Sequence, residues 1–131
     1  MTMVFTNFPV SDLQKSITFY QKLGFKLNED MQNEQSAAMM WDDNFWVMLL
    51  SHEFYQQFIG EKKLIDTKQY NTSMTAFSMD NVAEVKQFGK LAADNGGSTF
   101  HLELGFSEEQ LYQLEVEDLD GNQLQPIWMK V

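Results

Sequence analysis

The pattern of hydrophobic and polar positions predicts that the chain begins with a strand and a helix. Residues 3–8 alternate loosely and are rich in β-forming side chains. Apolar side chains then recur at Leu13, Ile17 and Tyr20, a spacing that places them on one face of a helix. We therefore expect a strand near residues 3–8 and a helix over residues 12–23.

Both ends of this helix carry boundary signals. The segment from Ser11 to Gln14 has the form of a capping box, in which a side-chain oxygen accepts hydrogen bonds from the first backbone amides. Gly24 follows the apolar stripe, and glycine commonly ends a helix in the left-handed conformation. Three strands are expected next, at about residues 25–31, 35–41 and 45–51.

The second part of the chain repeats this order of elements. Residues 53–70 lose the alternating pattern and are expected to form a partly helical connector. Asp120 and Gly121 predict a hairpin turn between the last two strands. The expected elements are a strand at 73–79, a helix at 81–95 and strands near 98–103, 110–117 and 122–130.

The two parts superpose at an offset of 69 residues, which pairs Phe5 with Met74 and Phe8 with Phe77. The turn at Asp43 and Asn44 also corresponds to the turn at Asp120 and Gly121 if the second part carries a longer hairpin. Because the order of a strand, a capped helix and three strands is shared, the sequence indicates an internal duplication.

Composition and charge exclude several classes of function. The 131 residues include 19 acidic and 9 basic residues, which gives a net charge of −10, and every basic residue is a lysine. Such a chain repels a polyanion and has no arginine for bidentate contacts with phosphate or guanine, so we expect no nucleic-acid partner. The absence of cysteine excludes disulfides, thiolate zinc sites, iron–sulfur clusters and cysteine nucleophiles.

Membrane association is not expected either. The first residues lack the basic start and the long apolar run of a signal peptide. No stretch reaches the roughly 20 apolar residues that a membrane span requires. We expect a soluble, cytoplasmic protein.

Two βαβββ units in a chain of this length resemble the vicinal oxygen chelate superfamily, which contains glyoxalase I, bleomycin-resistance proteins and extradiol dioxygenases. Residues 8–25 resemble its first strand and helix, residues 47–53 the end of its first module, and residues 117–129 the end of its second module. The likeness covers nearly the whole chain and is closest to small bacterial glyoxalase-like proteins.

The resemblance implies the fold class and the domain organisation. We expect an α+β protein in which two βαβββ modules form a cupped mixed sheet. The single domain would consist of modules at about residues 1–52 and 72–131, joined by a connector at about residues 53–71.

The resemblance also implies where a metal would bind. Enzymes of this superfamily hold a divalent metal with four side chains, usually His or Glu, at positions that fall here on Phe5, Met48, Met74 and Gln125. Phenylalanine has no donor atom, and a thioether suits Cu(I) rather than hard or borderline ions. Because one amide oxygen cannot offset the dehydration of a divalent ion, we expect no metal and no other cofactor.

A rebuilt metal site stays open as an alternative. His52 and His101 could hold a metal together with Glu103 and Glu115 if these side chains converge. A simpler interpretation makes His52 a rim or capping residue and the two glutamates part of a solvated face.

The concave face of the sheet is the expected ligand site, because strand alternation directs Phe5 and Asn7 away from the first helix. An aromatic, thioether and amide lining suits a flat or flexible apolar ligand, although the same side chains could simply fill the cup. A buried Gln125 amide would need Asn7, Gln123, a water or a ligand as its partner. The expected ligand-binding residues are Phe5, Asn7, Trp46, Met48, Met74, Gln123 and Gln125.

These observations leave three functional hypotheses. The first is a metal-independent small-molecule-binding protein of the bleomycin-resistance type that binds an apolar or aromatic ligand. The second is a metal-dependent lyase, isomerase or dioxygenase of the same superfamily. The third is a purely structural dimer without a ligand. A homodimer is expected, and the sequence determines neither the ligand nor whether the chain catalyses a reaction.

Overall fold

A computed structural model describes all residues from 1 to 131 and contains two compact units, residues 1–70 and 71–131. The first unit contains β1 (Val4–Val10), α1 (Leu13–Leu23), β2 (Lys26–Leu27), a short 3-10 helix η1 (Glu29–Met31), β3 (Ser36–Met40), β4 (Phe45–Ser51) and α2 (His52–Ile59). The second contains β5 (Met74–Ser78), α3 (Val82–Asp94), β6 (Ser98–Phe100), β7 (Leu111–Gln113), β8 (Glu115–Glu117) and β9 (Gln123–Met129).

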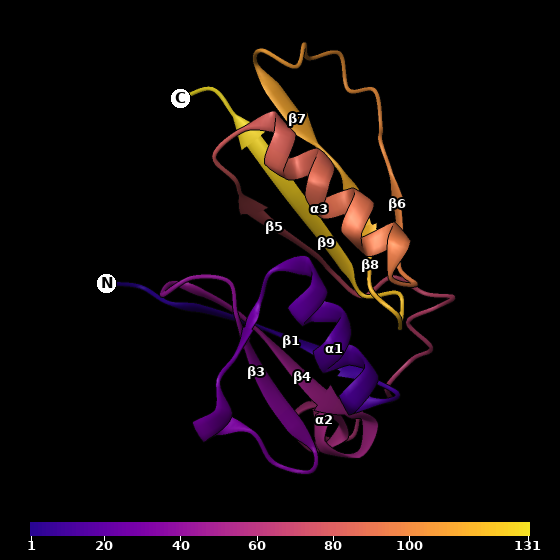
Figure 1. The fold of residues 1–131 in the computed structure, drawn as a ribbon. Coiled ribbons are helices and arrows are strands. Elements are labelled where there is room, and N and C mark those ends of the chain that lie inside the picture. Colours follow the sequence, from indigo (N-terminus) through magenta and orange to yellow (C-terminus); the bar gives the residue numbers. More distant parts are fainter. The chain divides into compact units, whose positions relative to one another are not determined.

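The first unit is a four-stranded mixed sheet in the order β1-β4-β3-β2 (Figure 1). Strand β1 pairs with β4 in parallel, with Asn7 opposite Met48, and the other pairs are antiparallel. Helix α1 packs on β3 and β4, while α2 packs on β1 and β4. The helix expected within the connector is therefore α2, and it belongs to the first unit.

The second unit repeats this plan in its own sheet (Figure 1). Strand β5 pairs in parallel with β9, β8 pairs with β9 and with β6, and β7 pairs with another part of β9. Helix α3 packs against this sheet. The α+β fold class with two βαβββ modules is confirmed, and the strands are divided between two mixed sheets.

Capping side chains explain where the helices begin. Asp12 is the N-cap of α1, because its side chain accepts a hydrogen bond from the backbone amide of Lys15 at 3.0 Å. The cap is thus Asp12 and not the Ser11 of the expected capping box. Asn81 caps α3 in the same way, accepting from the amide of Glu84 at 2.8 Å.

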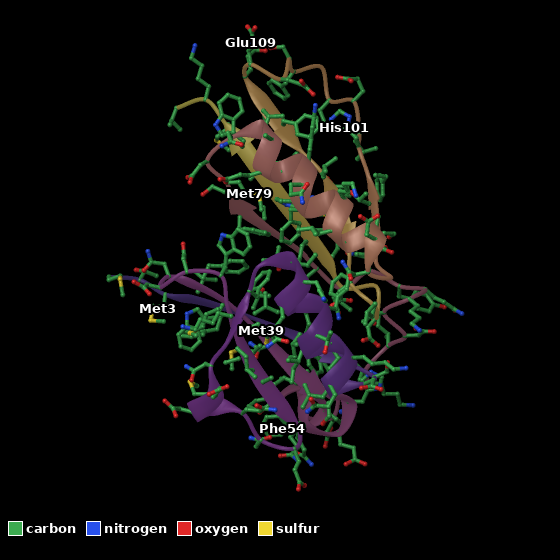
Figure 2. The ribbon with its side chains drawn as sticks, in the orientation of Figure 1. Met3, Met39, Phe54, Met79, His101 and Glu109 are labelled. Atoms are coloured by element: carbon green, nitrogen blue, oxygen red, sulfur yellow. The ribbon has the colours of Figure 1, made fainter.

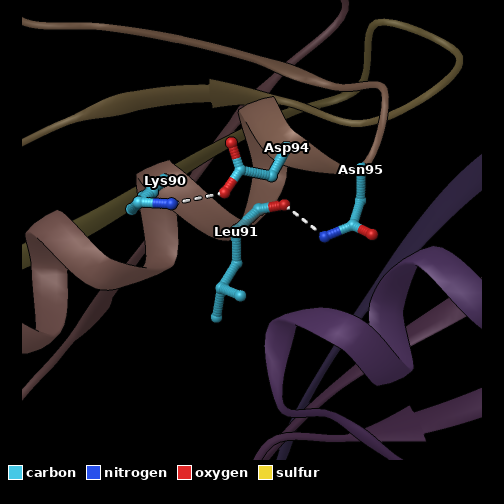
Figure 3. Close-up of polar contacts among 4 residues, drawn as sticks. All are labelled: Lys90, Leu91, Asp94 and Asn95. Atoms are coloured by element: carbon cyan, nitrogen blue, oxygen red, sulfur yellow. Dashed lines mark hydrogen bonds and ion pairs between the residues drawn. The ribbon is translucent and has the colours of Figure 1, made fainter.

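Helix ends follow the signals in the sequence. Gly24 has a φ of +110°, and its amide donates to the last carbonyls of α1. At the end of α3, the Asn95 side chain donates to the carbonyl of Leu91 at 2.7 Å, and Lys90 pairs with Asp94 at 2.6 Å (Figure 3). The Asn95 contact satisfies a carbonyl group in the last turn of the helix, and the ion pair joins two side chains four residues apart.

Three expected strands are shorter or interrupted. The strand predicted near residues 98–103 ends at Phe100. The strand predicted at residues 25–31 is limited to Lys26–Leu27, because residues 29–31 turn into a 3-10 helix whose cap is Asn28. The strand predicted at 110–117 is divided into β7 and β8 at Leu114. Side-chain hydrogen bonding and a local break in the ladder were not visible in the apolar alternation.

Each unit has its own core between the helix and one face of the sheet. Met39, Val47 and Leu49 are fully buried in the first unit, and Met39 is labelled in Figure 2. In the second unit Val85 and Phe88 on α3 are buried along with sheet residues such as Leu124. No helix of the chain is both long and apolar enough to cross a membrane.

Candidate functional site

The face of the first sheet opposite α1 carries the expected site residues of this unit; we call it the first distal face. Alternation along β4 places Val47 and Leu49 in the core and Trp46 and Met48 on the other face. Parallel pairing then brings Phe5 beside Trp46 and Asn7 beside Met48. The structure therefore places all four expected residues of the first unit on one face.

This first distal face is apolar and partly accessible. The Phe5 side chain is 47% exposed and makes an edge-to-face contact with Trp46 at a centroid distance of 5.4 Å. The Trp46 indole is fixed by donation from its Nε1 to the carbonyl of Asp42 at 3.0 Å. Trp46 and Met48 are half-buried, whereas Asn7 is exposed. The face can therefore contact a flat apolar group with a preorganised aromatic pair.

The face of the second sheet opposite α3, here called the second distal face, is polar at its centre. Thr75, Phe77 and Leu124 point toward α3, so the alternate residues Met74, Gln123 and Gln125 share the other face. Pairing of β5 with β9 places Met74 beside Gln123. The three expected residues of the second unit therefore also lie on one face.

A buried carboxylate organises this second distal face. Glu115 on β8 is only 4% exposed, and its Oε1 accepts hydrogen bonds from Gln123 Nε2 at 2.9 Å and Gln125 Nε2 at 2.7 Å. Its Oε2 accepts from Gln113 Nε2 at 2.9 Å. We call these four residues the amide cluster. Three neutral donors stabilise a charge that would otherwise be costly to bury.

Glu115 corrects two sequence-based expectations. The partner of the Gln125 amide is Glu115, not Asn7 or Gln123. Glu115 is also not part of a solvated face, although Glu103 is exposed as expected. The signal in the sequence was the alternation of polar residues in two segments. Gln-x-Glu at 113–115 spans β7 and β8, and Gln-x-Gln at 123–125 lies on β9, which pairs with both.

The histidines do not assemble a metal site with carboxylates. His52 is the first residue of α2, after the N-cap Ser51. His101, which is labelled in Figure 2, follows β6. Its ring stacks on Tyr112 with a centroid distance of 4.7 Å and an angle of 18° between the rings. No group of three or more His, Cys, Asp or Glu side chains is arranged to hold a metal ion. The rebuilt metal site is therefore not formed by these residues in this structure.

The four positions at which the resemblance implies a metal carry side chains that do not fit one. In the first unit they are Phe5 and Met48, which offer no hard donor atom. In the second unit, Gln125 Nε2 lies 3.6 Å from the Met74 sulfur and 2.7 Å from Glu115. Thioethers and a phenyl ring occupy three of the four positions, whereas a divalent ion requires oxygen or nitrogen ligands.

Residues 2–41 match a family model described as bleomycin resistance protein-like N-terminal. A hypothetical protein from S. aureus has a similar structure, with a TM-score of 0.77 and 23% identity over 98% of this chain and 94% of that one. A glyoxalase/bleomycin resistance protein/dioxygenase family enzyme from Burkholderia phytofirmans gives a TM-score of 0.76 at 16% identity, covering 99% of this chain and 100% of that one.

A genomically encoded fosfomycin resistance protein from Listeria monocytogenes also has this fold, with a TM-score of 0.68 and 14% identity over 100% of this chain and 93% of that one. No curated protein matches the chain. At these identities the structural likeness shows the fold, and function has to be argued from the residues of the site.

Proposed function

We propose that this chain is a metal-independent small-molecule-binding protein of the vicinal oxygen chelate superfamily. Its fold and the family-model match over residues 2–41 support this proposal. Its ligand would be an apolar or aromatic molecule, and the residues of each distal face are the candidate contacts. The observation that carries this proposal is the chemistry of the family's metal positions. Phe5, Met48 and Met74 replace hard ligands with surfaces suited to an apolar molecule.

Exposure supports ligand binding over simple filling of a core. A side chain that only fills space inside a protein is buried, but Phe5 is 47% exposed and Met74 is 60% exposed. An exposed aromatic group on the first distal face, and an exposed thioether beside fixed amides on the second, are the kinds of side chain that line binding sites. The amide cluster would supply the directional contacts that an apolar surface lacks.

The alternative is a metal-dependent lyase, isomerase or dioxygenase. It is supported by the names of the structural neighbours, because the protein from Burkholderia phytofirmans is described as a family enzyme. The donor atoms of this chain argue against it, since the four positions supply at most one neutral oxygen, from Gln125.

A combined metal and ligand experiment tests this proposal. The protein is dialysed against a chelator and its melting temperature is measured alone, with Zn²⁺, Ni²⁺, Mn²⁺ or Fe²⁺, and with a library of aromatic fragments. We expect fragments to raise the melting temperature and metals to leave it unchanged, since only a ligand of the folded state stabilises it. Stoichiometric metal binding with a loss of stability on chelation would favour the enzyme instead.

A further inference from the structure

Glu115 is a buried charge whose partners are all neutral. It is 4% exposed, and its three hydrogen bonds come from the glutamine amides of the amide cluster. Amide donors stabilise the carboxylate but do not neutralise it, so the negative charge persists on the second distal face. Lysines and histidines contribute none of these bonds.

The orientation of the amides leaves acceptor atoms for a ligand. Because Gln113 and Gln125 direct their Nε2 atoms to Glu115, their carbonyl oxygens accept no hydrogen bond within the protein. The Gln123 carbonyl is different, since it accepts from Asn71 Nδ2 at 2.9 Å. A carboxylate has about four acceptor positions and Glu115 uses three, so the cluster is rich in acceptors and poor in available donors.

We propose that the amide cluster binds a primary ammonium group carried by an apolar ligand. The group would donate to the carbonyl oxygens of Gln113 and Gln125 and to the remaining acceptor position of Glu115. This inference rests on the proposed function and adds the chemical class of the ligand. An ammonium ion has several hydrogen-bond donors, and it also brings the positive counter-charge that no partner of Glu115 supplies.

The residues near the amide cluster and the net charge of the chain also favour a cationic ligand with an apolar part. Met74 contacts Gln125 through its sulfur and is 60% exposed, so it offers an apolar surface beside the amide cluster. The net charge of −10 attracts cations and repels anions before contact. A carboxylate ligand would bring like charge to Glu115 and find no cationic side chain among the four residues of the cluster.

The experiment uses three probes that share one phenyl group and differ in charge: 2-phenylethylammonium, 2-phenylethanol and 3-phenylpropionate. Their dissociation constants are measured by isothermal titration with the wild-type protein, Glu115→Gln and the control Glu109→Gln. Glu109 lies in the exposed segment before β7 (Figure 2), and its change removes the same charge as Glu115→Gln.

We expect the wild-type protein and Glu109→Gln to bind the ammonium at least about tenfold more tightly than the alcohol, and the propionate least tightly. Glu115→Gln should bind the ammonium and the alcohol about equally. Retention of the ammonium preference in Glu115→Gln, or equal binding of all three probes by the wild type, would overturn the inference while leaving the proposed function standing. Absence of binding by every probe would overturn the inference, and a failed fragment screen would separately overturn the proposed function.

A measurement on the wild-type protein covers the case in which Glu115→Gln does not fold. Adding 2-phenylethylammonium should shift the side-chain amide signals of Gln113 and Gln125 in a heteronuclear NMR spectrum. The amide signal of Gln87, which is exposed on α3, should stay in place. Shifts of equal size at Gln87 and at the cluster would show unspecific association and reject the site.

Discussion

A single buried carboxylate determines the chemistry of the second distal face. Glu115 holds three glutamine side chains in fixed orientations, and through Gln125 it also fixes the contact with the Met74 sulfur. The sequence predicted Gln123 and Gln125 as site residues, but it did not predict that Glu115 orients them. The reason is physical: strand alternation predicts which face a residue occupies, whereas a hydrogen-bond partner depends on pairing and register.

Gln125→Leu tests the structural part of this cluster. Removing the Nε2 donor leaves the buried carboxylate with one fewer hydrogen bond, so we expect the free energy of unfolding to fall by about 1.5–3 kcal/mol. Denaturant melts measure the change. Gln87→Leu makes the same substitution at an exposed helical position and should change stability by less than about 0.5 kcal/mol. Equal effects of the two changes would contradict the importance of the bond.

Gly89 lies where α3 comes close to its sheet. A Cβ atom at this position would lie 2.6 Å from Leu114 Cδ1 and 3.0 Å from Thr99 Oγ1. Alanine normally stabilises a helix by about 1 kcal/mol relative to glycine, but overpacking costs about 1–3 kcal/mol. Because Leu114 is buried, we expect Gly89→Ala to lower the melting temperature.

A double-mutant cycle with Leu114→Ala provides the control for this prediction. Removing the Leu114 side chain makes room for the new methyl group, so the loss caused by Gly89→Ala should shrink or reverse in that background. Additive effects of the two changes would show that the contact does not cause the loss.

Lys86 has a raised pKa, chiefly because its Nζ hydrogen-bonds to Glu108 at 2.8 Å. A lysine whose pKa is raised by folding stabilises the protein below its unfolded-state pKa, and this contribution disappears as the pH rises through the folded-state pKa. We expect Glu108→Gln to lower the pKa of Lys86 toward the ordinary lysine value. NMR titration of the Lys86 side chain in the wild-type protein and in Glu108→Gln measures this change.

At the scale of elements, the caps decide where helices begin. Asp12→Ala removes the acceptor for the Lys15 amide, and we expect it to lower the free energy of unfolding by about 1 kcal/mol. Asp12→Asn is the matched control, because asparagine is an equally good N-cap and removes only the charge. If Asp12→Asn and Asp12→Ala lower the free energy of unfolding equally in chemical denaturation, the loss of charge and not the loss of the cap causes the effect.

Long periodic segments were predictable from the sequence, and short interrupted ones were not. Helices α1 and α3 lie within one residue of their predicted limits because apolar spacing and capping residues agree. The strand predicted over 110–117 is divided because the pairing with β9 is interrupted at Leu114, whose amide nevertheless donates to the Pro126 carbonyl. Such an interruption leaves no trace in the apolar pattern, since Tyr112, Leu114 and Val116 all remain buried.

At the scale of the whole molecule, duplication is visible in the pairing of the strands. Each unit begins with a strand that pairs in parallel with the last strand of its sheet, β1 with β4 and β5 with β9. The same plan nevertheless produces two chemically different distal faces, one aromatic and one organised by Glu115. The two modules share a plan but carry different side chains on their distal faces. The shared plan made the fold recognisable from the sequence, whereas the ligand depends on the side chains.

A homodimer is the last expectation, and it follows from an edge of the first sheet. Strand β1 lies at the edge of the order β1-β4-β3-β2, with Val4 54% exposed and Phe5 47% exposed. An edge strand with exposed apolar side chains favours pairing with a second copy, and two-fold symmetry makes such an interface self-complementary.

Multi-angle light scattering at micromolar concentration should therefore give twice the chain mass of 15.3 kDa. Val4→Lys places a charge on the edge strand and should shift the protein toward the monomer. Phe58→Lys adds the same charge at a residue of α2 that is 68% exposed, and it should leave the dimer intact. A wild-type protein that scatters only as the 15.3 kDa species would show that the edge stays unpaired. A dimer that both lysine variants weaken equally would contradict an interface at the edge strand β1, because Phe58 does not lie on that strand.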